Sequence, residues 1–278
     1  MTILVTGATG MVGRGVVAEL LAAGQRVRAL TRRPAEANLP DGVEVVGGDL
    51  DDPESLRAAL DGVERMYPFP TGRTARGVVA AASRAGVRRV VVLSGALADS
   101  DDSEDGYLAV EHAVEESGLE WTHVRPGEFA ANWLDWADSI RHERVVRRPY
   151  GGAVTQPTHE ADIAAVAATV LVEDGHAGRR YTLAGPEALT TLDQVRAIGA
   201  AIGAEVRFEE VDPAQARTQW IRDGYPEEFV DWIFAMWAES ARDPAPVNEE
   251  WAGIVPLLTG RPARTFTQWA TDHAVDFR

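Results

Sequence analysis

The chain has 278 residues, a formal net charge of −16 and no cysteine. Such an acidic surface repels nucleic-acid phosphates and anionic lipids, and without thiols the chain forms no disulfide and has no thiolate nucleophile. No apolar run approaches the length of a membrane span and no leader precedes the first apolar run, so we expect a cytoplasmic protein that binds neither nucleic acid nor membrane.

The first two predicted elements enclose a glycine-rich turn. An apolar run at 3–5 precedes it, and apolar residues at helical spacing follow it. Glycine lets the backbone approach a diphosphate closely, and the helix N-terminus supplies free N–H donors. The residues predicted to bind the diphosphate of a dinucleotide are Gly7, Ala8, Thr9, Gly10, Met11, Val12 and Gly13. The alternative is a tight strand–helix turn without a ligand.

The second predicted strand, 27–30, is followed by Arg32 and Arg33. An NAD site usually carries Asp or Glu near this position for the ribose 2′-hydroxyl, whereas arginine suits the 2′-phosphate of NADP. Because arginine is present and no acid competes, we predict NADP(H) as the cofactor, with these two residues at the 2′-phosphate. The alternative is that both arginines are solvated loop residues.

Strand and helix patterns then alternate, as expected for βαβ units with a parallel sheet. Further strands are predicted at 43–46, 63–69, 87–93, 121–124 and 181–183, and helices at 52–62, about 73–84, 107–116 and 158–172. Ligands bind beyond the carboxyl ends of such strands. We therefore predict a binding rim that includes residues 68–71, 94–96 and 125–128. The further residues predicted to bind the cofactor there are Asp49, Leu50, Phe69, Ser94 and Pro126. Asp49 is assigned to the adenine amine, and Phe69 and Ser94 to the ribose and nicotinamide. The alternative for each residue alone is ordinary capping of a strand end.

The composition changes after residue 127, because seven of the eight tryptophans lie at or after position 133. The side chains predicted to bind a small-molecule substrate are Trp133 and Trp136 in one helical stretch, and Tyr225 and Phe229 in another at 220–237. The alternative for this second stretch is a helical core, since Phe229, Trp232 and Trp237 have core spacing.

The predicted fold class is α/β, with a Rossmann-type, doubly wound parallel sheet and a smaller, mostly helical C-terminal substrate lobe. The NADP-binding domain is predicted at 1–127 plus about 158–183. The substrate lobe is predicted at about 128–157 and 184–278.

Several segments together resemble the NmrA-like group of atypical short-chain dehydrogenases/reductases. The matching segments are 7–13, 31–33, 48–50, 117–122 with 125–126, 162–164, 175–178 with 181–183, and 258–262. Within this group the pattern is similar to NADPH–quinone oxidoreductases and triphenylmethane reductase. The resemblance implies an NADP-preferring Rossmann fold with a small substrate lobe, in a family that contains both reductases and nucleotide-sensing regulators.

Extended members of the superfamily use a Tyr-x-x-x-Lys dyad, which is missing here. Counted back from Glu111, which resembles the glutamate four residues after that lysine, the lysine position holds Tyr107 and the tyrosine position Ser103. All 27 basic side chains are arginine, so the lysine has not moved elsewhere in this chain. Tyr107 and His112 are weak candidates for a catalytic proton donor, the alternatives being a helix-surface tyrosine and a solvated histidine.

We therefore expect an NADPH-dependent reductase that transfers hydride to a small, planar, electron-poor substrate, either quinone-like or conjugated. The alternatives are a non-catalytic NADP(H)-sensing regulator that acts through a protein partner, and an enzyme that uses the cofactor for a non-reductive step. A homodimer is compatible with each of these. No metal is expected, because the six histidines show no paired spacing and cysteine is absent.

Overall fold

The computed structural model describes residues 1–69, 72–100 and 106–278, which group into two units. The first unit comprises Met1–Gly127, Glu160–Leu183 and Gly253–Pro262, and the second comprises Glu128–His159, Ala184–Ala252 and Ala263–Arg278. Residues 253–262, which the sequence boundaries assign to the substrate lobe, contain helix α11 (Ile254–Thr259) and belong to the first unit.

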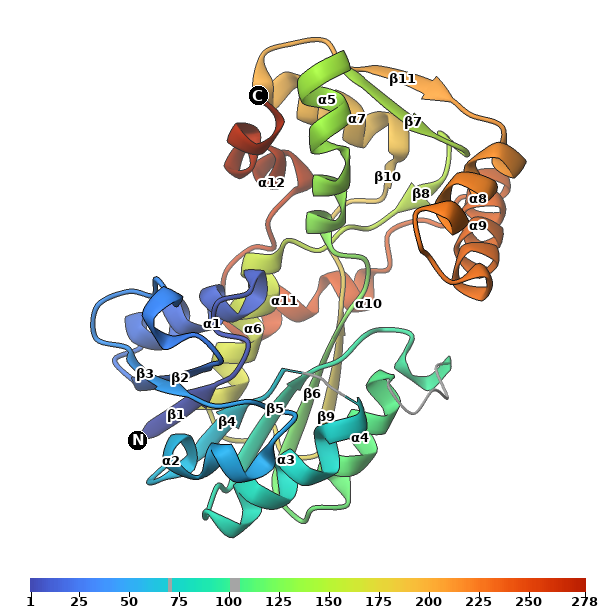
Figure 1. The fold of residues 1–278 in the computed structure, drawn as a ribbon. Helices are drawn as coiled ribbons and strands as arrows, with labels where there is room; N and C mark the ends of the chain where they lie inside the picture. The colour runs from blue at the N-terminus through green and yellow to red at the C-terminus, as the bar shows by residue number, and fades with distance from the viewer. Residues whose placement is uncertain (70–71, 101–105) are drawn as a thin grey trace. The chain divides into compact units, whose positions relative to one another are not determined.

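A seven-stranded parallel sheet forms the centre of the first unit (Figure 1). In spatial order its strands are β3 (Glu44–Gly47), β2 (Arg26–Thr31), β1 (Thr2–Val5), β4 (Arg65–Tyr67), β5 (Arg89–Leu93), β6 (Glu120–Pro126) and β9 (Arg179–Leu183). The chain runs outward from β1 to β3, returns to place β4 beside β1, and continues to β9. This doubly wound order confirms the predicted fold class, and it makes the β1–β4 boundary the switch point at which such sheets bind ligands.

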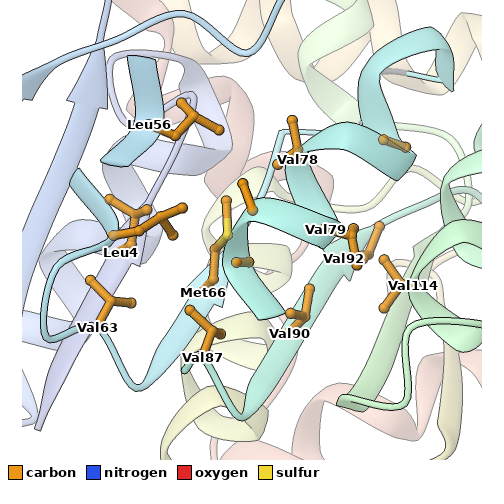
Figure 2. Packing of buried hydrophobic residues seen from close by; sticks show 14 of the residues in the cluster. Leu4, Leu56, Val63, Met66, Val78, Val79, Val87, Val90, Val92 and Val114 are labelled. Atoms are coloured by element: carbon orange, nitrogen blue, oxygen red, sulfur yellow. The ribbon is translucent and has the colours of Figure 1, made fainter. Parts of the chain in front are cut away.

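Helices cover both faces of this sheet. They are α1 (Met11–Ala22), α2 (Arg57–Leu60), α3 (Gly72–Arg84), α4 (Tyr107–Glu115), α6 (Glu160–Val172) and α11, with the 3₁₀ turns η1 (Pro34–Glu36), η2 (Pro53–Leu56) and η3 (Ala98–Ser100) between them. On one face, Leu4, Met66 and Val90 lie in register on neighbouring strands and pack against Val78 of α3 and Val114 of α4 (Figure 2). The alternate strand residues are buried as well, so the strands read as continuous apolar runs.

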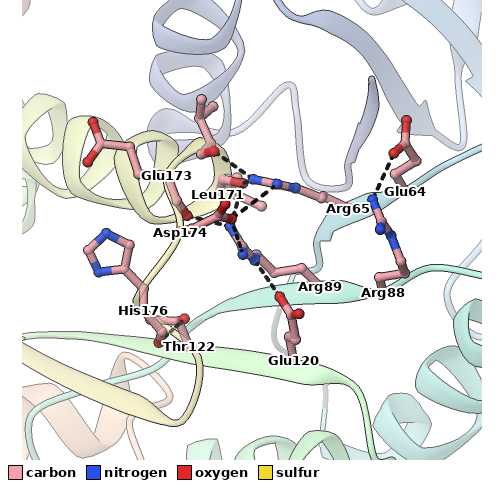
Figure 3. Close-up of polar contacts among 11 residues, drawn as sticks. Glu64, Arg65, Arg88, Arg89, Glu120, Thr122, Leu171, Glu173, Asp174 and His176 are labelled. Atoms are coloured by element: carbon pink, nitrogen blue, oxygen red, sulfur yellow. Dashed lines mark hydrogen bonds and ion pairs between the residues drawn. The ribbon is translucent and has the colours of Figure 1, made fainter.

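Helix α6 is buried on nearly all sides. Two arginines, at the amino ends of β4 and β5, bind its C-terminal end (Figure 3). Arg65 donates hydrogen bonds to the carbonyl oxygens of Leu171 and Val172, and Arg89 donates to that of Glu173. The last carbonyl groups of a helix have no partner within the helix, and they carry partial negative charge. These guanidinium groups therefore satisfy the helix end and fix α6 against β4 and β5.

The second unit contains more helix than strand. Its elements are η4 (Ala130–Trp136), α5 (Ala137–Glu143), β7 (Val145–Arg148), β8 (Val154–Thr155), β10 (Leu189–Thr190), α7 (Thr191–Ile202), β11 (Arg207–Glu210), α8 (Pro213–Arg222), α9 (Glu227–Arg242), α10 (Glu249–Ala252), α12 (Phe266–Asp272) and η5 (Ala274–Phe277). Strand β10 pairs with β8 antiparallel, and β11 pairs with β7 in parallel. One core cluster is built around Trp269 and Phe266, and another around Trp237 and Phe234.

The observed elements differ from the predicted ones in three places. The predicted helix 52–62 is a 3₁₀ turn followed by a single α-helical turn, and Trp133 and Trp136 lie in a 3₁₀ segment. The aromatic stretch 220–237 is divided into α8 and α9, because Gly224 adopts a positive φ of 98° and Pro226 has no N–H for a continuous helix. Across the described ranges, no helix is both long and apolar enough to span a bilayer.

Replacing Arg89 with methionine should lower the free energy of unfolding by about 2–4 kcal/mol, because the change leaves the carbonyl oxygen of Glu173 and the carboxylate of Glu120 without their guanidinium partner and removes the nearer of the two arginines that pair with Asp174. The matched control is Arg88→Met, since Arg88 pairs with Glu64 at the surface and its loss should cost less than about 1 kcal/mol. Urea unfolding of both variants measures the difference. Equal losses would contradict the role assigned to Arg89.

Candidate functional site

The turn between β1 and α1 has the backbone geometry of an anion cradle. Gly7 adopts a positive φ of 59°, and the N–H of Gly10 donates to the carbonyl oxygen of Gly7 at 2.9 Å. Gly10 is the N-cap residue of α1, and no side chain caps the helix. The N–H groups of the first turn of α1 are therefore left to a ligand or to solvent.

Two of the glycines are required by close approach. A Cβ atom at Gly13 would lie 2.1 Å from the carbonyl oxygen of Gly7, so only glycine lets α1 begin directly over the turn. A Cβ atom at Gly7 would lie 2.9 Å from the ring of Phe69, whose backbone N–H donates to the hydroxyl oxygen of Thr6 at 2.5 Å. The turn is thus packed between α1 on one side and the end of β4 on the other.

A cavity of about 390 Å³ opens beside this turn, at the carboxyl ends of β1, β2 and β3. The residues that line it are Thr6, Gly7, Thr9, Gly10, Leu30, Thr31, Arg32, Arg33, Gly48, Asp49, Leu50, Asp51 and Phe69. Eight of the residues predicted to bind the cofactor are in this set. Asp49 is held in place by Ser55, whose hydroxyl accepts from the Asp49 N–H at 2.9 Å.

The other predicted cofactor residues do not line the cavity. Ala8, Val12 and Gly13 are buried beneath the turn, whereas the side chain of Met11 is exposed. Ser94 and Pro126 are buried at the ends of β5 and β6, and Ser94 lies beside the carboxyl group of Glu111. Residues 70–71 of the predicted rim lie outside the described residues.

The two arginines after β2 differ in their partners. Arg33 forms an ion pair with Glu36 at 2.7 Å, and both side chains are exposed. Arg32 has no ion-pair or hydrogen-bond partner among residues 1–69, 72–100 and 106–278. A guanidinium group at the cavity that no carboxylate neutralises is available for an anionic ligand, so Arg32 is the better placed of the two.

Sequence reasoning missed a third arginine. Arg14, in the first turn of α1, donates to the carbonyl oxygens of Thr9 at 3.0 Å, Asn38 at 2.8 Å and Ala37 at 3.1 Å. It therefore ties the glycine turn to the segment that follows Arg32. The signal in the sequence was a positive charge at a helix N-terminus, which the helix dipole disfavours unless the side chain has a specific role.

The weak candidates for proton transfer lie on α4. Tyr107 begins this helix and packs against Gly95 after β5, where an added Cβ atom would lie 3.1 Å from the tyrosine ring. His112 is exposed, and Ser103 lies outside the described residues. Sequence reasoning missed Tyr67 at the end of β4, whose hydroxyl is buried and whose pKa is raised by burial and by the nearby Tyr107. Of these, Tyr67 and Tyr107 lie at the carboxyl edge of the sheet.

The buried Arg125 and Glu111 form the centre of an ion-pair network between β6 and α4. Arg125 donates to Glu111 at 2.8 and 2.5 Å and to Asp99 at 2.8 and 2.9 Å. Burial alone would raise the pKa of Glu111, but the bonds from Arg125, the neighbouring Ser94 and the nearby positive charges together hold that pKa below its usual range. Glu111, Glu115 and His123 offer three ligand atoms within 4.8 Å of one another, yet Arg125 and Arg180 already pair with the carboxylates. The cluster is therefore an ion-pair network that orients α4.

The predicted substrate residues of the second unit have different environments. Trp133 is buried and stacks on the half-buried Trp136, with ring centroids 4.7 Å apart. Tyr225 and Phe229 are 41% and 40% exposed and stack on each other at 6.1 Å. Trp237 is buried in the core of this unit. Core packing, the alternative stated for the stretch 220–237, therefore applies to Trp237 but not to Phe229.

The arrangement in the first unit offers free N–H donors and a guanidinium group around one cavity, which is suited to a phosphorylated dinucleotide. One curated relative, (4-alkanoyl-5-oxo-2,5-dihydrofuran-3-yl)methyl phosphate reductase of Streptomyces griseus, is 42% identical, and the match covers 99% of each chain. The NAD(P)H azoreductase of Xenophilus azovorans is 35% identical, again over 99% of each chain.

Among solved structures, the NADPH-dependent quinone oxidoreductase of Escherichia coli in complex with NADPH superposes with a TM-score of 0.79. It is 26% identical, and the match covers 97% of this chain and 99% of that one. The model of the NmrA-like family matches residues 1–248. The predicted resemblance is confirmed: this chain belongs to the NmrA-like family.

Proposed function

We propose that the chain is an NADPH-dependent reductase of small, planar, electron-poor acceptors. The observation that carries this proposal is the cavity of the first unit, where the uncapped N-terminus of α1 and the guanidinium group of Arg32, which pairs with none of the described residues, lie around one space. Both relatives support it, because both are named as reductases. The name of the Streptomyces griseus relative describes a substrate with an unsaturated five-membered ring, two carbonyl groups and a phosphate ester. The name of the Xenophilus azovorans relative describes azo compounds.

The residues present fit NADP(H). The first-turn N–H groups of α1 would bind the diphosphate, and Gly7 and Gly13 allow the backbone to approach it. Arg32 would bind the 2′-phosphate, while Arg14 holds the adjoining segment in place. Asp49 would accept from the adenine amine. When bound, the reduced nicotinamide supplies the hydride.

The chain's own contribution to chemistry is positioning and exclusion of water rather than acid catalysis through a dyad. Three kinds of acceptor take hydride at one atom and spread the resulting charge over other atoms. They are a double bond conjugated with a carbonyl group, a quinone and an azo group. Protonation then follows from solvent or from Tyr107, whose ring packs against Gly95 after β5. Isolated ketones, which need the proton during hydride transfer, should be poor substrates.

The absence of lysine favours one second function, a regulator that binds NADP(H) without turnover and acts through a protein partner. The aromatic side chains of the second unit favour the reductase, since a sensor has no need of a surface for planar molecules. A homodimer is compatible with either function.

Substituting Arg32 with alanine should weaken NADPH binding about tenfold or more and leave NADH binding almost unchanged, because a charge-assisted bond to a phosphate is lost. Arg33→Ala should have a smaller effect, since Glu36 already engages that side chain. Arg26→Ala, at the other end of β2, is the matched control. Calorimetric titration measures both coenzymes, and equal losses for NADPH and NADH would refute the assignment.

Placing alanine at Gly13 should raise the Kd for NADPH at least about tenfold and destabilise the fold by roughly 1–3 kcal/mol, because the new Cβ meets the carbonyl oxygen of Gly7. Gly152→Ala is the control: no atom lies within 4 Å of a Cβ built there, so binding and melting temperature should stay at wild-type values. If Gly13→Ala bound NADPH normally, the turn would not be the diphosphate site.

Purified protein should oxidise NADPH steadily with a quinone, an azo dye or an acylated unsaturated lactone as acceptor, and should show no turnover with a simple ketone. Loss of reduced-nicotinamide absorbance reports the rate. Tight NADPH binding without oxidation by any member of this panel would replace the reductase with the regulator.

A further inference from the structure

Arg148, the last residue of β7, carries a buried guanidinium group that hydrogen-bonds to none of the described residues. The residue is 4% exposed, and none of its three side-chain nitrogen atoms forms a hydrogen bond within the described part of the chain. Glu210, its register partner on β11, accepts instead from the N–H groups of Tyr150 and Gly151. The five N–H donors of this guanidinium group are therefore unsatisfied by the residues around it.

Three tryptophans surround Arg148. The carbon at the centre of its guanidinium group lies 3.6 Å from the ring centroid of Trp237, 4.7 Å from that of Trp133 and 5.9 Å from that of Trp136. Burial lowers the pKa of Arg148 to about 10, so the group stays charged at neutral pH. Cation–π contacts stabilise that charge over the ring faces but leave the N–H edge of the guanidinium plane unused.

Glu128, in the same unit, attracts Arg148 electrostatically but forms no hydrogen bond with it. No ion pair joins the two within the described ranges, and one carboxyl oxygen of Glu128 is buried without a hydrogen-bond partner. Burial raises the pKa of this carboxyl group, although the charge of Arg148 opposes the shift. Glu128 therefore leaves the N–H donors of Arg148 unfilled.

A buried cation with unfilled donors costs free energy unless an acceptor reaches it. We propose that Arg148 is an oxyanion-binding residue of the second unit, which takes the phosphate or carboxylate group of the substrate on its free N–H edge. The planar fork of a guanidinium group matches two oxygens of either anion. Of the three tryptophans, Trp136 alone is partly exposed, which makes its side of the cluster the entry route.

This assignment rests on the proposed function for its substrate class: the reductase would act on planar acceptors that carry a negative charge. The aromatic rings and the guanidinium group then bind different parts of the substrate. Trp133 and Trp136 contact the apolar part of the acceptor, and Arg148 selects for the anion.

The test uses intrinsic tryptophan fluorescence of the full chain, because three tryptophans report directly on Arg148. Inorganic phosphate and benzoate are titrated separately, with sodium chloride at equal ionic strength as the blank. We expect a saturable change with one of the two anions, which identifies the substrate group as phosphate or carboxylate. A wild-type protein that responds to neither anion overturns the proposal.

Two variants sharpen the measurement. Arg148→Met should abolish the response, and Arg148→Lys, which keeps the charge but loses the planar fork, should weaken it about tenfold. Arg147→Met is the matched control, because the side chain of Arg147 is partly exposed and pairs with Glu143 and Glu209. If Arg148→Met fails to fold, the lysine variant decides: unchanged affinity there contradicts the site.

Turnover gives a second readout. Methyl red carries a carboxylate, and methyl yellow is the same azo dye without it. Arg148→Met should raise the KM for methyl red about tenfold while leaving its kcat and the KM for methyl yellow unchanged. Equal changes for both dyes would indicate a structural role and overturn the proposal. If neither dye is reduced by wild type, the reductase fails, and the fluorescence titration still tests Arg148.

Discussion

The structure depends on the contact between Gly13 and the carbonyl group of Gly7. Only a hydrogen atom fits between the first turn of α1 and that oxygen, since a Cβ would lie 2.1 Å away. This approach aims the uncapped end of α1 at the space beyond β1, where the doubly wound order also brings the ends of β2 and β3. A helix end, a guanidinium group and a carboxylate thereby gather around one cavity, although Gly10, Arg32 and Asp49 are well separated along the chain.

The fold class and much of the cavity at the carboxyl ends of β1, β2 and β3 were predictable because they depend on local patterns. Valine-rich runs become buried parallel strands, and a glycine turn between a strand and a helix has few other uses. The bonds of Arg14 to Ala37 and Asn38 were not predictable, since they join segments that only the folded chain brings together. Composition located the aromatic residues of the second unit but could not show that Trp237 is buried while Phe229 is exposed.

Exclusive use of arginine shapes the chemistry available to this chain. Guanidinium groups remain charged at any physiological pH, so they bind anions and helix ends but do not exchange protons. Among the described arginines, Arg65 and Arg89 bind the end of α6, and Arg125 binds the carboxylate of Glu111 on α4. Arg32 lines the cavity. Because the chain has no lysine, a proton donor is another residue type, such as the tyrosine hydroxyl groups at the carboxyl ends of the strands, or solvent.

The sheet of the first unit is assembled from segments that are far apart in the sequence. Strand β9 and helix α6 follow an excursion of 32 residues, Glu128–His159, into the other unit. During synthesis, the first six strands leave the ribosome before β9 exists, so the edge of β6 stays unpaired and α6 is missing from its face. The nascent chain consequently exposes an unpaired strand edge until residue 183 has emerged. During that time a chaperone or another strand competes with β9 for pairing with β6.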